Sequence, residues 1–224
     1  IIVFIHPGHG EATEYLNFIK FISLKNKIYA IENNIFNDLI CPPTSIKQMA
    51  KKYMNLLLST FSKQEKKFIL SGWSFGGNVA VAMAEQLQNT KKVKHLILFD
   101  SWLKHTTAFN DKTAFQRLFQ AKIKVNPKLQ YIQNWIQLHW GRAKLLSRYL
   151  NNNKIDIPCC LFKASKLEPE YQEINNASNY WETVFGNKLS VYDLNTTHST
   201  IFSQNSLENT VKIFQTVLEK INEQ

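Results

Sequence analysis

The pattern Gly-x-Ser-x-Gly occurs once in a setting that favours covalent chemistry, as GWSFG at residues 72–76. The apolar run FIL leads into it and a segment with helical spacing leads out, which is the strand–turn–helix context of a nucleophile elbow. The sharp turn strains the serine backbone, and only small neighbours such as Gly72 and Gly76 avoid collision there. We therefore expect Ser74 Oγ to stand clear of a sheet edge as a nucleophile. The alternative is an ordinary glycine-rich turn.

A serine hydroxyl needs a base to remove its proton and an acid to orient that base. With this elbow the partners follow in the chain order serine, acid, histidine. The chain has six histidines, and five of them are unsuitable as the base. His6 and His9 precede the serine, and His95 is expected to be exposed ahead of a strand. His105 and His139 lie in a long insertion. His198, in the loop YDLNTTHSTIF after the last expected strand, is the predicted base.

Three carboxylates could serve as the orienting acid. Asp100 ends the apolar run HLILFD, Glu168 follows the next run, and Asp193 lies near His198 but inside an expected strand. A carboxylate at the carboxyl end of a parallel strand shares the sheet edge with Ser74, so Asp100 and Glu168 both qualify. We prefer Asp100, although it could instead cap the segment that follows.

An oxyanion formed by attack of Ser74 requires backbone N–H donors. The N–H of Phe75, directly after the serine, is the first candidate. The second is the N–H of Gly8 in HPGHGE, where glycines let the backbone approach a substrate closely. His6 of the same loop is expected to be a packed histidine.

The segments around these residues alternate between short apolar runs and longer helical patterns, which predicts an α/β fold with a mainly parallel sheet flanked by helices. The expected strands are Ile1–Ile5, Lys27–Ile31, Lys67–Ser71, Val93–Phe99, Ile157–Ala164 and Leu189–Leu194. The expected helices are Glu11–Leu24, one capped by Ser45, one following Ser74, and Leu207–Ile221. Residues 1–224 are expected to form one domain.

Residues 101–154 break the alternation, because they contain helical patterns but no clear strand. An insertion of this length is far longer than the usual connection of about two to six residues. It is either a structural elaboration or a helical lid over a site.

Composition excludes several classes of protein. The chain carries a net charge of +10, but its lysines are scattered and no nucleic-acid-binding motif is present. No apolar stretch approaches membrane-spanning length, and the opening IIVFIHPG is expected to be a strand rather than a signal peptide. Cys41, Cys159 and Cys160 match no metal site, and the adjacent pair is expected to be packing residues in a reducing, cytoplasmic compartment.

The sequence resembles the thioesterase domains of nonribosomal peptide and polyketide synthases, which belong to the α/β-hydrolase superfamily. The segments that carry the resemblance are FIHPGHG, SIKQMAKKYMNLL, LSGWSFGGNVAVAMAEQL, LILFDSW and NYWETVFGNKLSVYDLNTTHSTIF. They cover nearly the whole chain except the insertion. His9 departs from the pattern, because relatives carry a smaller residue there.

The resemblance implies a nucleophile at Ser74, an acid at Asp100, a base at His198 and oxyanion donors at Gly8 and Phe75. Some relatives keep the acid after the later strand, where this chain offers only glutamates, and this favours Asp100. The implied substrate is an acyl or peptidyl chain held as a thioester on the phosphopantetheine arm of a carrier protein. The arm arrives with that partner, so neither a dissociable cofactor nor a metal is expected. Carrier proteins are typically acidic, which would give the positive charge a purpose.

The sequence is also compatible with three alternatives to a terminal synthase domain. A general carboxylesterase or lipase would use the same three side chains. A stand-alone editing thioesterase would share every motif quoted. A non-catalytic binding module with this fold is the third alternative, although all three catalytic positions are filled.

Overall fold

The computed structural model describes residues 1–22, 26–33, 43–62, 67–104, 140–149, 153–168, 172 and 176–223. Its strands are β1 (Ile2–Ile5), β2 (Ile28–Ile31), β3 (Phe68–Trp73), β4 (Val93–Phe99), β5 (Cys159–Ala164) and β6 (Leu189–Leu194). Its helices are α1 (Thr13–Lys20), α3 (Ile46–Thr60), α4 (Phe75–Leu87), α7 (Glu182–Phe185) and α8 (Gln204–Glu223), with short 3₁₀ turns η1 (Gln88–Thr90), η4 (Gly186–Lys188) and η5 (His198–Thr200).

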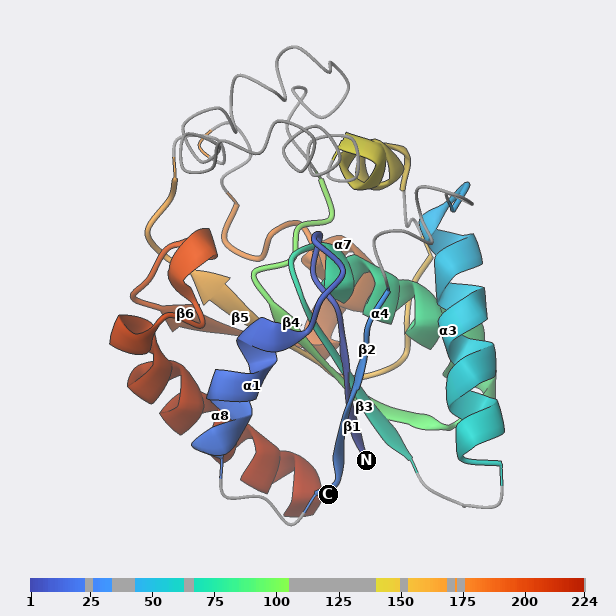
Figure 1. Ribbon diagram of the computed structural model, residues 1–224, viewed down its shortest axis with the longest axis horizontal. Helices are drawn as coiled ribbons and strands as arrows, with labels where there is room; N and C mark the ends of the chain where they lie inside the picture. The colour runs from blue at the N-terminus through green and yellow to red at the C-terminus, as the bar shows by residue number, and fades with distance from the viewer. Residues whose placement is uncertain are drawn as a thin grey trace, which may run out of the picture.

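The strands form one parallel sheet in the order β2-β1-β3-β4-β5-β6. This confirms the predicted parallel sheet flanked by helices, and each predicted strand is present with its ends shifted by at most two residues. In a parallel sheet all carboxyl ends meet at one edge. The loops after β1, β3, β4 and β6, which carry the predicted site residues, therefore lie together (Figure 1).

Alternation along the strands divides the core into two layers. Val3 and Ile5 of β1 pack with α3 and α4 on one face of the sheet, whereas Ile2 and Phe4 pack with α1 and α8 on the other. Figure 1 shows these helix pairs on opposite sides of the sheet. Burial on both faces explains why most strands read as continuous apolar runs.

The helix boundaries follow local signals only in part. Ser45 caps α3 as predicted, because its Oγ accepts a hydrogen bond from the N–H of Gln48 at 3.1 Å. The first helix begins at Thr13 rather than Glu11, and α8 extends beyond the predicted Leu207–Ile221 at both ends. Solvent-exposed turns at helix ends carry no apolar periodicity, so the pattern could not place these boundaries.

The predicted lid lies mostly outside the described residues, which include only 101–104, 140–149, 153 and 154 of the insertion. Residues 140–148 are helical, and their apolar side chains Ala143, Leu145 and Leu146 belong to the core layer under α3 and α4. This part of the insertion is thus integrated with the sheet rather than placed apart from it.

Cys159 and Cys160 are buried in β5 with free thiols, as expected of packing residues. Burial raises the pKa of the Cys159 thiol well above its usual value and raises that of Cys160 to about 12. Cys41 lies outside the described residues. Within the described part of the chain, no group of three or more His, Cys, Asp or Glu side chains could hold a metal ion, and no helix has the length and apolar character needed to cross a membrane.

Two histidines outside the predicted catalytic residues, His6 and His95, are buried as neutral groups. His6 donates from Nδ1 to the Pro7 carbonyl at 2.7 Å and accepts from the Tyr53 hydroxyl at 2.7 Å, which matches the packed role expected of it. His95 lies inside β4 and is 7% exposed, so the expectation that it would be exposed is wrong. Burial is the main cause that lowers the pKa of His6 to about 3 and that of His95 to about 4.

We expect these two histidines to make the protein less stable as the pH falls from 6.5. Both folded pKa values lie below the ordinary value of 6.5, so the unfolded chain binds protons that the folded chain does not. Between pH 7 and pH 5, each residue should lower the free energy of unfolding by about 2 kcal/mol. Urea unfolding at pH 7 and pH 5 measures this effect. Between the two pH values, the free energy of unfolding should fall less in the double variant His6→Gln, His95→Gln than in the wild type.

The matched control for this experiment is Tyr53→Phe, which removes the partner of His6 but leaves the imidazole buried. Its loss of stability between pH 7 and pH 5 should equal that of the wild type, because burial and not the phenol shifts the pKa. An unchanged loss in the double variant would contradict this account of the two histidines.

Candidate active site

Ser74 occupies a strained turn between β3 and α4. Its φ of 54° lies in the region that non-glycine residues rarely adopt, and its ψ is −121°. A Cβ at Gly72 would lie 2.3 Å from the carbonyl carbon of Gly76, and one at Gly76 would lie 2.4 Å from the carbonyl oxygen of Ile5. The space that the elbow requires is therefore available only because both positions are glycine.

Three side chains from three loops meet at this edge of the sheet. His198 Nε2 lies 3.1 Å from Ser74 Oγ, and His198 Nδ1 lies 2.8 Å from Asp100 Oδ2. Asp100 is 1% exposed and His198 is 8% exposed. A carboxylate can only accept, so the Nδ1 proton faces Asp100 and Nε2 is left to accept the serine proton.

The other two acids considered from the sequence lie elsewhere. Glu168 accepts hydrogen bonds from Ser199 N at 3.3 Å and from Ser199 Oγ at 3.0 Å. Asp193 lies within β6, as expected. Asp100 is the carboxylate that meets the His198 ring.

Asp100 is fixed by groups that sequence reasoning did not identify. Its φ is 40°, its N–H donates to the Phe162 carbonyl at 2.8 Å, and its Oδ1 accepts from the N–H of Ala164 at 3.1 Å. A second donor to Oδ1 is Nδ2 of Asn179, also at 3.1 Å. These bonds hold the carboxylate at the end of β4 and direct Oδ2 toward the imidazole.

Tyr15 of α1 joins the first loop to the elbow. Its hydroxyl donates to the Ile5 carbonyl at 2.9 Å and accepts from the N–H of Trp73 at 2.8 Å. The side chain is fully buried, and burial raises the pKa of its phenol. Tyr15 thereby fixes the end of β1 relative to the residue before the nucleophile. No local pattern indicated this role, because Tyr15 occupies an apolar position of an amphipathic helix.

The loop that carries Gly8 is supported from the insertion. Arg142, which is 3% exposed, donates from Nη1 to the Gly8 carbonyl, and its guanidinium carbon lies 5.6 Å from the centre of the Phe75 ring. The Gly10 N–H closes the turn by donating to the Pro7 carbonyl at 3.1 Å. Phe75 is the first residue of α4, and the first N–H groups of a helix have no acceptor within the helix. Gly8 and Phe75 therefore lie at the same edge as Ser74.

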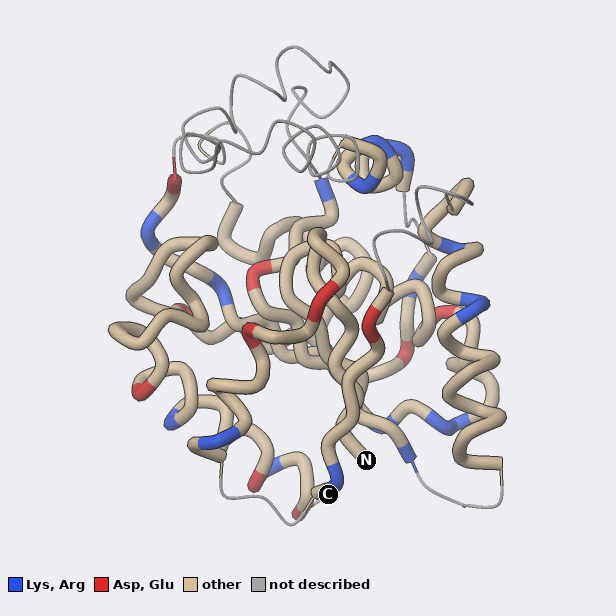
Figure 2. Tube along the Cα trace, viewed as in Figure 1, with Lys and Arg blue, Asp and Glu red and all other residues tan. Residues whose placement is uncertain are grey.

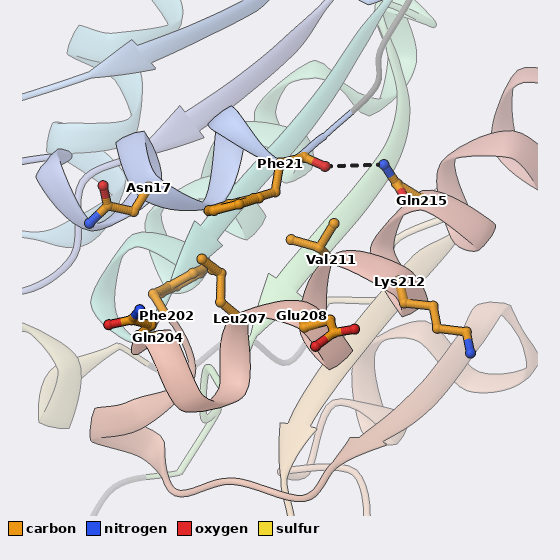
Figure 3. Close-up of a pocket in the computed structure, with 9 residues that line it drawn as sticks. All are labelled: Asn17, Phe21, Phe202, Gln204, Leu207, Glu208, Val211, Lys212 and Gln215. Carbon is orange, nitrogen blue, oxygen red and sulfur yellow. Dashed lines mark hydrogen bonds between the residues drawn. The ribbon is translucent and has the colours of Figure 1, made fainter.

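A separate hollow lies between α1 and α8 on the opposite face of the sheet from α3 and α4 (Figure 3). Its volume is about 760 Å³, and the Phe21 carbonyl accepts from Gln215 Nε2 across it at 3.3 Å. Phe202 lines the hollow and also contacts Trp73, with ring centres 5.6 Å apart. None of the predicted site residues lines it, so we assign the hollow no part in the chemistry.

Comparison with known proteins identifies the family. Residues 1–218 match the family model described as the Thioesterase domain. The chain is 29% identical over 128 residues to a probable thioesterase, gloN, of Glarea lozoyensis, a match that covers 56% of this chain and 43% of that protein. It is 30% identical over 102 residues to the dimodular nonribosomal peptide synthase of Bacillus subtilis, covering 45% of this chain and 4% of the synthase. The chain thus spans less than half the length of these curated relatives.

Solved structures share the fold. The NocB thioesterase domain, in covalent complex with a fluorophosphonate nocardicin G analogue, matches with a TM-score of 0.79 at 20% identity, covering 97% of this chain and 93% of that one. The RedJ thioesterase of the prodiginine pathway in Streptomyces coelicolor matches with a TM-score of 0.75 at 14% identity, covering 96% and 89%. At these identities the similarity concerns the arrangement of strands and helices.

Proposed function

The chain belongs to the thioesterase domain family, a family of hydrolases that act on thioesters, and from this premise we propose that it releases acyl chains through a covalent intermediate on Ser74. The observation that carries the proposal is the row of hydrogen bonds from Ser74 Oγ through His198 to Asp100, at 3.1 Å and 2.8 Å. The strained backbone at Ser74 adds support, because such strain persists where function requires it.

The first half-reaction forms an ester. His198 Nε2 takes the hydroxyl proton while Ser74 Oγ attacks the thioester carbonyl carbon. The N–H groups of Gly8 and Phe75 hold the resulting oxyanion, and Asp100 stabilises the imidazolium. The carbon–sulfur bond then breaks, and the leaving thiolate receives the proton from His198.

The second half-reaction frees the serine. A water molecule, or a nucleophilic group within the acyl chain, attacks the ester carbonyl while His198 takes its proton. The carbon–oxygen bond to Ser74 breaks, and Ser74 Oγ recovers the proton from His198. Water gives a free acid and an internal nucleophile gives a ring. None of these proton transfers or bond changes requires a dissociable cofactor.

The acyl group is proposed to arrive on the phosphopantetheine arm of an acidic carrier protein. Exposed cations support this, because Lys47 and Arg148 line one small hollow of about 140 Å³ between α3 and residues 140–148. Lys51, one helical turn after Lys47, and Lys144, one helical turn before Arg148, are also exposed, and Figure 2 shows basic residues on both elements. We further propose that residues 1–224 form one domain whose insertion, at about 101–154, acts as a lid over the acyl chain.

The test compares matched acyl donors with the purified protein. Acyl-pantetheine thioesters should be turned over faster than oxygen esters of the same acyl group, and a carrier-bound thioester should give the highest kcat/KM. A rise in salt should weaken only the carrier-bound reaction, because exposed charges are screened. Equal rates on oxygen esters without a gain from the carrier would point to a general carboxylesterase instead.

A further inference from the structure

The turn at residues 176–181 is built to place one buried amide. Asn176 Oδ1 accepts from the N–H groups of Ser178 and Tyr180, both at 2.9 Å, which closes the turn. Asn179 and Tyr180 adopt positive φ values of 51° and 68°. Asparagine tolerates this conformation better than most residues, so the turn can present the Asn179 side chain inward at little cost.

The Asn179 amide is fully buried between two oxygen acceptors. Its Nδ2 lies 3.1 Å from Asp100 Oδ1 and 3.0 Å from the Ser101 carbonyl oxygen. Only the NH₂ end of the amide can satisfy a carboxylate and a carbonyl at once, so the neighbours determine its orientation. Both amide protons are used, one on each oxygen.

The two oxygens of Asp100 are therefore bonded differently. Oδ1 accepts from Asn179 and from the N–H of Ala164, while Oδ2 accepts from His198. One donor would leave the carboxylate free to rock about its Cβ–Cγ bond. Two donors on Oδ1 restrict that rotation and keep Oδ2 within hydrogen-bond distance of His198 Nδ1, at 2.8 Å.

We infer that Asn179 is a positioning residue for the proposed reaction, acting through Asp100 to hold His198 in line with Ser74. The inference rests on the proposed function for its effect on turnover. Ser101, whose carbonyl accepts from Asn179, also reaches the elbow, because its Oγ donates to the Ser74 carbonyl at 2.8 Å. Hydrogen bonds thus connect both Asp100 and Ser74 to the segment formed by Asp100, Ser101 and the turn.

The test uses Asn179→Gly with Trp181→Phe as its matched control. Glycine keeps the positive φ and removes the amide. Trp181 belongs to the same turn, and its Nε1 donates to the same Ser101 carbonyl at 2.8 Å. Among the described contacts, it makes no hydrogen bond to Asp100. We expect Asn179→Gly to lower kcat on acyl-pantetheine by about tenfold to a hundredfold with little change in KM. Trp181→Phe should stay within about threefold of the wild type.

A second measurement needs no substrate. The proton on His198 Nδ1, identified by its absence in His198→Gln, should give a downfield NMR signal in the wild type and in Trp181→Phe. In Asn179→Gly this signal should broaden or vanish. Should Asn179→Gly fail to fold, Asn179→Ala keeps the Cβ, removes both amide protons, and should give the same losses.

Equal losses of activity in both variants with the signal intact would overturn the inference, because the turn would then act only as structure. Wild-type kcat and an unchanged signal in Asn179→Gly would overturn it as well. A wild-type protein that turns over no thioester would refute the proposed function instead, and the NMR signal would still decide the role of Asn179.

Discussion

Ser74→Ala is expected to lower turnover of acyl-pantetheine thioesters by on the order of a thousandfold or more. The variant keeps the elbow, the imidazole and the oxyanion donors, but it has no atom to attack the carbonyl carbon. Only direct attack by water remains, aided by binding and by the N–H groups. Thiol release under saturating substrate measures the loss, and covalent labelling by a fluorophosphonate probe, followed by mass spectrometry, should disappear with it.

Ser71→Ala is the matched control, since Ser71 lies on β3, three positions before the nucleophile. Its Oγ is buried and makes no hydrogen bond with the described residues, so its removal should leave both activity and stability near wild-type values. If Ser74→Ala retained near-wild-type turnover, Ser74 would have no place in the mechanism. If the wild type resisted the probe while folded, the chain would be a binding module with a hydrolase fold.

The features that could be predicted from the sequence are those whose physical cause is local or periodic. Apolar runs that are buried on both faces revealed the strands. The glycines around Ser74 revealed the elbow, because a Cβ at either position would collide with backbone. The position of His198 beside Ser74 could be predicted from chain order, since it follows the last strand at the edge that carries the serine.

The parts that sequence reasoning missed depend on contacts between distant segments. Asn179 meets Asp100 across 79 positions of the chain, and Arg142 meets Gly8 across 134. Neither residue type stands out where it occurs, because an asparagine in a loop and an arginine in a helix are ordinarily solvated. His95 was misjudged for a related reason: its exposure depends on the elements that cover β4, which no local pattern reports.

Asp100→Asn is expected to lower kcat by roughly a thousandfold to ten-thousandfold while leaving the protein folded. The reason lies in the two donors on Oδ1. Because Ala164 N–H and Asn179 Nδ2 both require an acceptor there, the new amide must place its oxygen on that side. Its NH₂ group then faces His198 Nδ1, which is 2.8 Å from the present Oδ2. That nitrogen would have to accept a hydrogen bond, so the ring proton would move to Nε2 and block acceptance of the serine proton.

Glu168→Gln is the control that separates the two acids left open by the sequence. Glutamine keeps an oxygen for Ser199, to which Glu168 is bonded, and carries no charge, so turnover should stay within about threefold of the wild type. Single-turnover acylation, followed by release of the free thiol, measures both variants at the step in which His198 acts as base. The opposite ranking, with Glu168→Gln inactive and Asp100→Asn active, would assign the acid to the loop after β5. Equal and small losses would mean that the imidazole needs no carboxylate, and the hydrogen-bonded row at this edge would not be a catalytic unit.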